Sequence, residues 1–142
     1  MRENSRTGRT PQQVIDDAMW GVFQEGWNKP WGADADHIKN AQDIKKCVEA
    51  GYTFYTIDPG DYVDNDVYSD EINVLKEKFN LLPWSKLEAT STDFYSLYLD
   101  KTFSINNVTI HFDKKALLRA SCKYSRAIVH IKEMYRYLLA HK

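Results

Sequence analysis

The sequence predicts an α/β fold that contains a parallel βαβ unit and a long C-terminal helix. Three segments carry this prediction: a strand-like run at 31–39, a helical stripe at 41–50, and a β-branched and aromatic run at 52–57. Short connections between strand, helix and strand imply parallel pairing through a right-handed crossover. The length of 142 residues suits one domain with a real core.

The N-terminal part of the chain predicts an irregular arm followed by a helix. Residues 2–9 are polar and include Gly8, so we expect no regular structure there. Thr10 is a suitable N-cap, Pro11 suits the first helical position, and Gln13 completes a capping box. Apolar residues then recur at helical spacing, which predicts a helix over about 11–25.

The first predicted strand combines small residues with acidic ones. Strict alternation over 31–39 places Ala33, Ala35 and His37 on one face, and Asp34 and Asp36 on the other. In parallel α/β folds, chemistry gathers where strands end at their carboxyl termini. We therefore expect functional residues at the end of this strand and of the next one.

The helix and second strand of the unit have clear boundaries in the sequence. Asn40 is a typical N-cap, and Gly51 follows the apolar stripe as a C′ residue. The strand at 52–57 is stopped by the turn-forming run at 58–61.

Beyond residue 61 the pattern is weaker. It predicts a helix over 69–79, leaves 81–91 undecided, and indicates a helix from Phe94 that extends toward Phe103. Alternation predicts a strand at 107–112, and Asp113 caps a long helix over about 114–140. The expected buried stripe of that helix is Leu117, Ala120, Tyr124, Ala127, Ile128, Ile131, Tyr135 and Leu138.

Composition excludes several classes of function. Nineteen Lys and Arg against 20 Asp and Glu give a net charge of −1, which provides no field to attract nucleic acid. No apolar run reaches the roughly 18–20 residues of a membrane span, and no signal peptide is visible at the N-terminus. Cys47 and Cys122 are too few for a disulfide framework. These features are typical of a cytoplasmic protein in a reducing compartment.

Asp36 and His37 form the sharpest candidate site. A carboxylate beside an imidazole can accept a proton while the imidazole binds a divalent cation. The alternative is purely structural, with the aspartates capping the following helix and His37 buried in the core.

Other charged groups have the same two interpretations. Asp58, Asp61, Asp64 and Asp66 could bind a cation or orient substrate hydroxyls, but aspartate, proline and glycine also build tight turns. The run at 6–9 could clamp an anion or be a solvated arm. Arg126 and His130 share a face of the last helix, which could equally be solvated.

Four segments, at 6–11, 31–39, 51–64 and 123–131, resemble the tagaturonate epimerase family. The likeness runs over nearly the whole chain. It implies a metal-dependent epimerase on a TIM-barrel-like (β/α) fold that interconverts tagaturonate and fructuronate, two sugar acids that differ at C4. The small-molecule sugar acid is then the expected partner, with neither nucleic acid nor membrane involved.

The resemblance also implies roles for individual residues. Asp36 matches a proton acceptor, and His37 matches a ligand of a divalent cation, which could be nickel, iron, manganese or zinc. We expect the sugar acid to be bound by Asp34, Lys39, Asp58 and Asp61. The family's remaining metal ligands and its proton donor come from segments that do not occur in this sequence.

We therefore expect residues 1–142 to form a single α/β domain that is an incomplete part of a larger (β/α) barrel. Uncovered sheet edges and apolar faces would make the isolated chain self-associate. Two routes to inversion at C4 stay open. One is retro-aldol cleavage after proton removal from the C4 hydroxyl, and the other is movement of the ketone through other carbons of the sugar. The alternative functions are a metal-dependent lyase of aldolase type on the same scaffold and a non-catalytic remnant that binds sugar acids.

Overall fold

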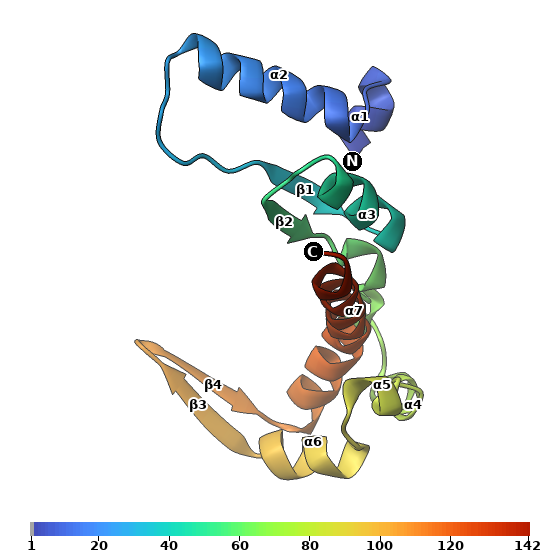
Figure 1. Ribbon diagram of the computed structural model, residues 1–142. Coiled ribbons are helices and arrows are strands. Elements are labelled where there is room, and N and C mark those ends of the chain that lie inside the picture. Colours follow the sequence, from blue (N-terminus) through green and yellow to red (C-terminus); the bar gives the residue numbers. More distant parts are fainter. Residues whose placement is uncertain (1) are drawn as a thin grey trace. The chain divides into compact units, whose positions relative to one another are not determined.

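The computed structural model describes residues 2–142, whose contacts divide into two compact units. Unit 1 runs through Asp58 and resumes at Ile131–Lys142, and unit 2 is Pro59–His130. Each unit has its own hydrophobic core, and the last helix contributes to both (Figure 1). The expectation of one domain over 1–142 stays a prediction.

Unit 1 confirms the predicted βαβ unit. Its elements are α1 (Arg2–Thr7), α2 (Pro11–Gln24), β1 (Asp34–Ile38), α3 (Ala41–Glu49), β2 (Phe54–Ile57) and the end of α7 (Lys114–His141). The two strands pair in parallel and form a two-stranded sheet.

The helix starts of unit 1 follow from their capping residues. At α2, the Thr10 side chain accepts from the Gln13 amide while the Gln13 side chain accepts from Thr10 N, so the predicted capping box is present. At α3, the Asn40 side chain accepts from Asp43 N at 2.9 Å. Each cap satisfies amide groups that lack an intrahelical partner, which is why both predicted boundaries are confirmed within one residue.

The prediction of an irregular arm at 2–9 was wrong, because α1 is a helix there. Gly8 adopts φ +67°, and Arg9 N donates to Asn4 O at 3.0 Å. This is the bond that closes a helix end with glycine in the left-handed conformation. Gly8 therefore marks a helix terminus.

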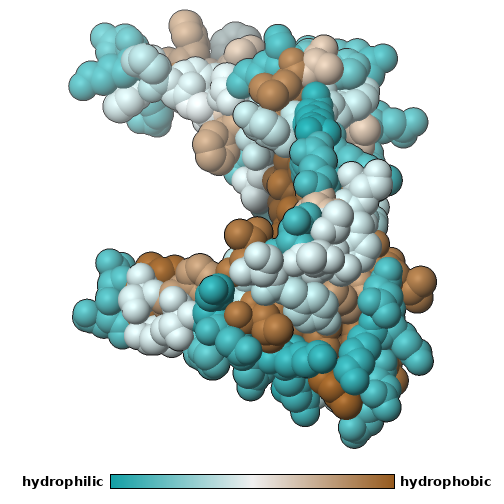
Figure 2. Space-filling model, turned by 90° about the horizontal axis from the view of Figure 1, so that it is seen from below, coloured by the Kyte–Doolittle hydropathy of each residue, from teal (hydrophilic) through white to brown (hydrophobic). Residues whose placement is uncertain are grey.

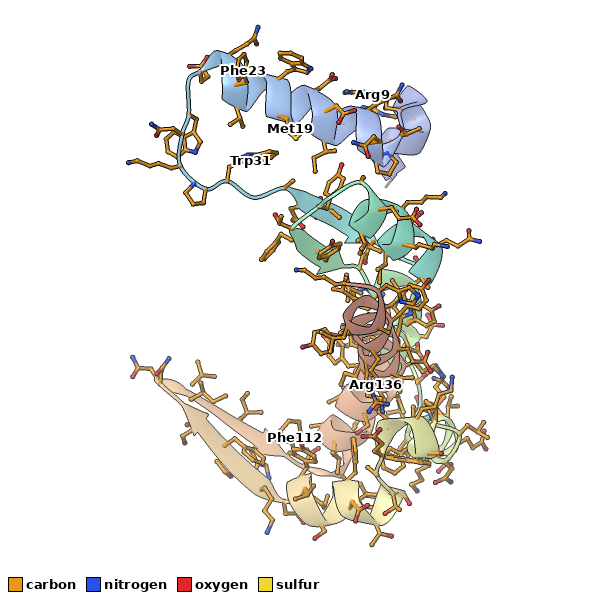
Figure 3. The ribbon with its side chains drawn as sticks, viewed as in Figure 1. Arg9, Met19, Phe23, Trp31, Phe112 and Arg136 are labelled. Atoms are coloured by element: carbon orange, nitrogen blue, oxygen red, sulfur yellow. The ribbon has the colours of Figure 1, made fainter. Side chains whose placement is uncertain are left out.

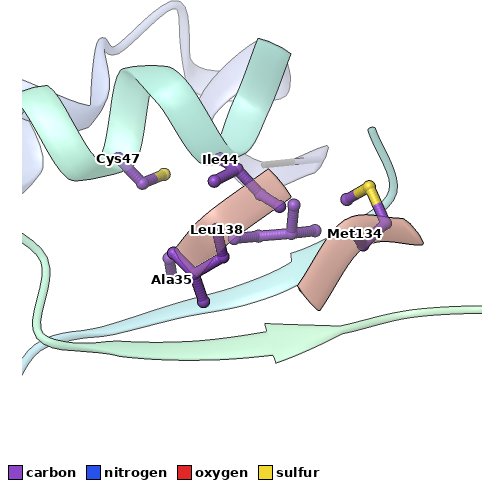
Figure 4. Packing of buried hydrophobic residues seen from close by; sticks show 6 residues of the cluster. Ala35, Ile44, Cys47, Met134 and Leu138 are labelled. Carbon is purple, nitrogen blue, oxygen red and sulfur yellow. The ribbon is translucent and has the colours of Figure 1, made fainter. Parts of the chain in front are cut away.

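The core of unit 1 lies on one face of the parallel sheet (Figure 4). Helices α3 and α7 both pack there, and Ile38, Ile44 and Cys47 are fully buried. The buried residues of this core are Ala35, Ile38, Ile44, Cys47, Met134 and Leu138. The opposite face carries the polar side chains of Asp34 and Thr56 together with the exposed ring of Phe54.

Unit 2 is mostly helical and ends in a β-ribbon. Its elements are η1 (Gly60–Tyr62), η2 (Asp66–Tyr68), α4 (Ile72–Asn80), α5 (Trp84–Leu87), α6 (Ser91–Tyr98), β3 (Lys101–Ile105), β4 (Val108–Phe112) and the first part of α7. Val67, Leu75 and Leu118 are fully buried in its core. The ring of Phe79 packs edge-on against Trp84, with centroids 4.9 Å apart.

Three expectations for unit 2 need correction. The helix predicted over 69–79 begins only at Ile72, because a 3₁₀ turn precedes it. Residues 84–87, left undecided by the sequence, form α5. Phe103 lies in strand β3 and not in a helix, since Leu99 adopts extended geometry and Asp100 has φ +56°, which ends α6.

The long helix α7 has the predicted bounds, but only part of the apolar stripe that the sequence predicted to be buried is buried. Asp113 Oδ1 accepts from Ala116 N at 2.8 Å and caps the helix. Leu117, Ala127 and Leu138 are buried as expected, whereas four members of the stripe are exposed. The exposed members are Tyr124, Ile128, Ile131 and Tyr135. Burial on the neighbouring side of the helix brings Ser125 and His130 into the core instead.

No helix within residues 2–142 combines the length and apolarity that crossing a bilayer requires. Cys47 and Cys122 are both free thiols and both buried, as the sequence predicts.

Candidate functional site

The end of β1 is distorted by a β-bulge. Asp34 pairs with Phe54 and Ala35 with Tyr55, but Ile38 pairs with Ile57, so β1 uses three steps where β2 uses two. His37 lies in this extra step and has φ +56°, a left-handed conformation that costs a residue with a side chain about 1–2 kcal/mol. A bulge of this kind re-aims side chains, and it occurs often beside functional sites.

The bulge brings Asp36 and His37 to the same side of the strand. Ala35 and Ile38 are buried, and the two residues between them are exposed. Strict alternation predicted His37 on the face of Ala35 and opposite Asp36, and this was wrong because the extra residue reverses the alternation. The structural alternative of a buried His37 is thereby contradicted.

Asp36 and His37 are joined directly. His37 Nδ1 lies 2.5 Å from Asp36 Oδ2, and the side chains are 65% and 57% exposed for His37 and Asp36. An ionised carboxylate can only accept, so the proton of a neutral imidazole sits on Nδ1 and the Nε2 atom carries the lone pair. Carboxylate-bound imidazole is a common arrangement for a metal-binding histidine.

Asp34 lies two residues before Asp36 on β1 and is also exposed. Thr56 Oγ1 donates to Asp34 Oδ2 at 2.8 Å, which fixes the orientation of this carboxylate. The sequence analysis did not single out Thr56. Sequence alone could not find it, because the pairing of Asp34 with Phe54, two residues before Thr56, is known only from the register of the two strands.

Lys39 and Asp58 meet at the carboxyl ends of the two strands. Lys39 Nζ lies 3.7 Å from Asp58 Oδ2, and Asp58 N donates to Ile38 O at 2.9 Å, which continues the pairing of the strands. Asp34, Asp36 and His37 thus lie on β1, and Lys39 and Asp58 directly follow β1 and β2.

Asp61 belongs to unit 2, where it is exposed on the turn η1. Its neighbour Tyr62 stacks on His130, with ring centroids 4.1 Å apart and an interplanar angle of 16°. His130 is 8% exposed, so the interpretation of the Arg126–His130 face as solvated was wrong for His130. Sequence alone gave no signal for Tyr62 as its partner.

The remaining aspartates of the acidic group serve unit 2 structurally. Lys78 Nζ lies 2.8 Å from Asp64 Oδ2 and 2.6 Å from Asp70 Oδ2, and all three side chains are largely buried. Burial alone would raise the pKa of Asp64, but hydrogen bonds from Lys78 and from the Asp66 amide lower that pKa below 3.8. The same carboxylates raise the pKa of Lys78. Turn and ion-pair chemistry therefore explains Asp64 and Asp66.

The N-terminal arginine run contributes to a separate surface. Arg9 pairs with Asp17 and donates to Gln13 O at 3.1 Å, so its guanidinium is held by helix α2. A surface depression of about 590 Å³ lies between the arm and α3 and is lined by residues such as Arg9, Lys46 and Glu49. Asp36 and His37 do not line it.

A metal ion needs more ligands than this chain assembles. Among residues 2–142, no group of three or more His, Cys, Asp and Glu side chains is arranged to hold one. His37 can offer one imidazole, whereas metal sites normally use three or four protein donors. The described residues can supply one ligand of a metal site but not a complete set.

Comparison with known proteins matches this chain to one family. The family model described as tagaturonate epimerase matches residues 1–142. The tagaturonate/fructuronate epimerase of Thermotoga maritima is 42% identical over 141 residues, which are 97% of this chain and 27% of that protein.

Solved structures give the same result. The fructuronate-tagaturonate epimerase from Cohnella laeviribosi, in a complex with one glycerol, superimposes with a TM-score of 0.83 at 37% identity. That match covers 96% of this chain and 27% of the other. Its native crystal structure matches with a TM-score of 0.82 at the same identity. The chain thus spans about a quarter of the length of the relatives it matches.

Proposed function

The chain belongs to the tagaturonate epimerase family, and from this premise we propose that it forms part of a hexuronate epimerase that interconverts tagaturonate and fructuronate. One observation supports this more than any other: the match to a named epimerase covers 97% of this chain, and within that stretch a bulged strand end presents Asp36 and His37 together. Such a paired acid and imidazole is what proton transfer on a sugar requires.

Asp36 is proposed as the proton acceptor. Its carboxylate is more than half exposed, so a bound sugar can reach it. In the retro-aldol route, this carboxylate takes the proton of the C4 hydroxyl, and the C3–C4 bond breaks to give an aldehyde at C4 and an enediolate over C2 and C3. After the aldehyde has rotated, the enediolate adds to its other face, the C3–C4 bond forms again, and the carboxylate returns the proton to the C4 oxygen. The bond to His37 keeps the carboxylate oriented toward the side of the strand on which the imidazole lies.

His37 is proposed as one ligand of a divalent cation, with the other ligands supplied by polypeptide that this chain does not include. The hydrogen bond at Nδ1 leaves the lone pair on Nε2, which is the atom a metal would take. A cation bound there would polarise oxygens of the sugar. We derive no step through it, because the described residues do not complete its site.

The sugar acid itself is proposed to contact Asp34, Lys39 and Asp58 of unit 1, whereas a contact with Asp61, which belongs to unit 2, stays a prediction from the sequence. The Lys39 ammonium suits a carboxylate of the substrate, and Asp34 and Asp58 can accept from hydroxyl groups. Thr56 holds Asp34, and Asp58 holds Lys39, so both pairs are oriented before any substrate binds. A reduced, cytoplasmic location is part of the proposal and accords with two buried free thiols.

The proposed scaffold is a (β/α) barrel of which this chain is a part. Parallel sheets occur in folds whose faces are both covered, and this chain covers one face of a two-stranded pair. Helix α7 follows β2 in the chain and packs on the same face as α3. A right-handed crossover from β2 through α7 would set a further strand beside β2.

The proposal is tested in a chimera, in which this chain replaces the matching 27% of the Thermotoga maritima relative. Asp36→Asn should lower turnover about 10²–10⁴-fold while bound metal is retained. His37→Ala should lose both turnover and metal, measured by elemental analysis. Asp66→Asn is the matched control, since Asp66 is an exposed turn residue. Turnover near that of the unmodified chimera in Asp36→Asn would contradict the role assigned to Asp36.

A further inference from the structure

The β-ribbon of unit 2 has one apolar face. Register pairs Phe103 with Ile110 and Ile105 with Val108, which places all four side chains on the same side. Phe103 is 37% exposed and Ile110 40%, whereas Ile105 is 62% exposed and Val108 59%. We call these four residues the ribbon face.

The other side of the ribbon is polar. Its paired residues are Thr102 with His111 and Ser104 with Thr109, and Thr102 Oγ1 lies 3.1 Å from His111 Nδ1. The ribbon is therefore amphipathic, with a side suited to water and a side suited to burial. Figure 2 shows that apolar residues, in brown, reach the surface of the molecule among polar ones in teal.

The ribbon is anchored at its base and uncovered at its tip. Phe112, which Figure 3 labels, lies with its ring centroid 5.9 Å from that of Phe103 and 6.0 Å from that of Tyr98. Toward the turn at Asn106, the most exposed members are Ile105 and Val108. Among the elements of unit 2, the largest contacts of the ribbon are between its own strands and with α6, which packs at the base.

A two-stranded ribbon is at best marginally stable in water unless a further layer covers its apolar face. None of the four side chains of the ribbon face is charged. The one charged residue on the same side, Lys101, lies at the base opposite Phe112, so the surface that covers the tip must itself be apolar. The size of the face then decides between possible occupants. A stable dimer needs roughly 800 Å² and 20–30 residues on each partner, far more than four side chains offer. A covering segment of the same polypeptide loses no translational freedom on docking and therefore needs much less area.

We propose that the ribbon face docks against an apolar surface of the polypeptide that the family's full-length enzymes carry outside the matched 27%. Through this contact the ribbon would join unit 2 to the remainder of the enzyme. This inference rests on membership of the family and on the ribbon, and it does not depend on the roles assigned to Asp36 and His37.

Maleimide labelling of single cysteines tests the proposal. Ile105→Cys places a thiol on the ribbon face, and Ser104→Cys places the matched control on the polar side. The native Cys47 and Cys122 are buried and contribute little background. In the isolated chain both new thiols should react fast. In the chimera with the Thermotoga maritima relative, Ile105→Cys should react at least about tenfold more slowly, while Ser104→Cys keeps its rate.

Two outcomes would overturn the proposal. Equal labelling of Ile105→Cys in the chimera and in the isolated chain would show that the remainder of the enzyme does not cover the face. Protection in the isolated chain that rises with its concentration would show that a second copy is the occupant. Val108→Cys with Thr109→Cys repeats the comparison on the second strand, should the first pair fold poorly. Turnover of the chimera is recorded separately, so failure of the proposed function is distinguishable.

Discussion

The two units use their polar residues in opposite ways. In unit 1, Asp36 and His37 are exposed at a bulge, and His37 keeps a left-handed backbone conformation. In unit 2, Lys78 is enclosed by two carboxylates, beside a core in which aromatic rings surround Phe79. The residues of the candidate site therefore lie apart from the aromatic core of unit 2. Unit 1 holds groups in strained, reachable positions, and unit 2 holds groups that stabilise.

The sharpest way to test this comparison is to remove packing from each unit. Phe79→Ala should lower the free energy of unfolding by about 3–5 kcal/mol, because Phe79 is 1% exposed and its ring contacts Trp84 and Tyr95. Phe54→Ala on β2 is the matched control, since that ring is 64% exposed and its loss should cost less than about 1 kcal/mol. Urea unfolding of the isolated chain measures both. Equal losses would break the comparison.

The ion pairs of unit 2 should give the next largest effect. Lys78→Met leaves Asp64 and Asp70 facing each other without a cation, which should cost about 1–3 kcal/mol for groups that are largely buried. Lys45→Met removes the exposed pair with Glu49 in unit 1 and should cost no more than about 0.5 kcal/mol. A Lys78→Met chain as stable as the Lys45→Met chain would contradict this prediction.

The same cluster predicts a dependence on pH. The folded pKa of Asp64 lies below its ordinary 3.8, so the unfolded chain binds protons first as the pH falls. The stabilisation is therefore complete above pH of about 4 and is lost as the pH drops through the lowered folded pKa. Thermal unfolding between pH 2 and pH 6 should show this loss. In Lys78→Met the loss should be smaller, because the main hydrogen bond that lowers the pKa is gone.

The smallest expected effect concerns the strain at the site itself. Because His37 has φ +56°, His37→Gly should be more stable than His37→Ala by about 1 kcal/mol, since alanine still pays for the left-handed conformation. At Ile38, where no positive φ occurs, alanine should be the more stable of the two. Chemical unfolding of the four variants decides the matter. A preference for alanine at position 37 would mean that the bulge is not strained.

The local elements were predictable because their signals are local. Thr10, Asn40 and Asp113 each bond to amides three residues ahead, so their helices begin where the sequence indicates. Of the two strands of the ribbon, the sequence predicted β4 but not β3. Strand β3 follows shortly after helix α6, and the apolar spacing of that helix continues to Phe103. The resemblance to the epimerase family was likewise carried by contiguous motifs, and the match over 1–142 confirms it. Self-association of the isolated chain stays a prediction.

By itself the sequence determined the parallel βαβ unit, the capped helices and the identity of the acid and imidazole that follow one another on the first strand. Tertiary structure alone decided on which side of that strand His37 lies, because an extra residue in one strand is defined only against the register of its partner. It also decided that His130 is buried beneath Tyr62 while Tyr124 and Ile128 are exposed. The periodicity of a helix marks an apolar stripe, but burial depends on which elements pack against it, and that is a property of the assembled chain.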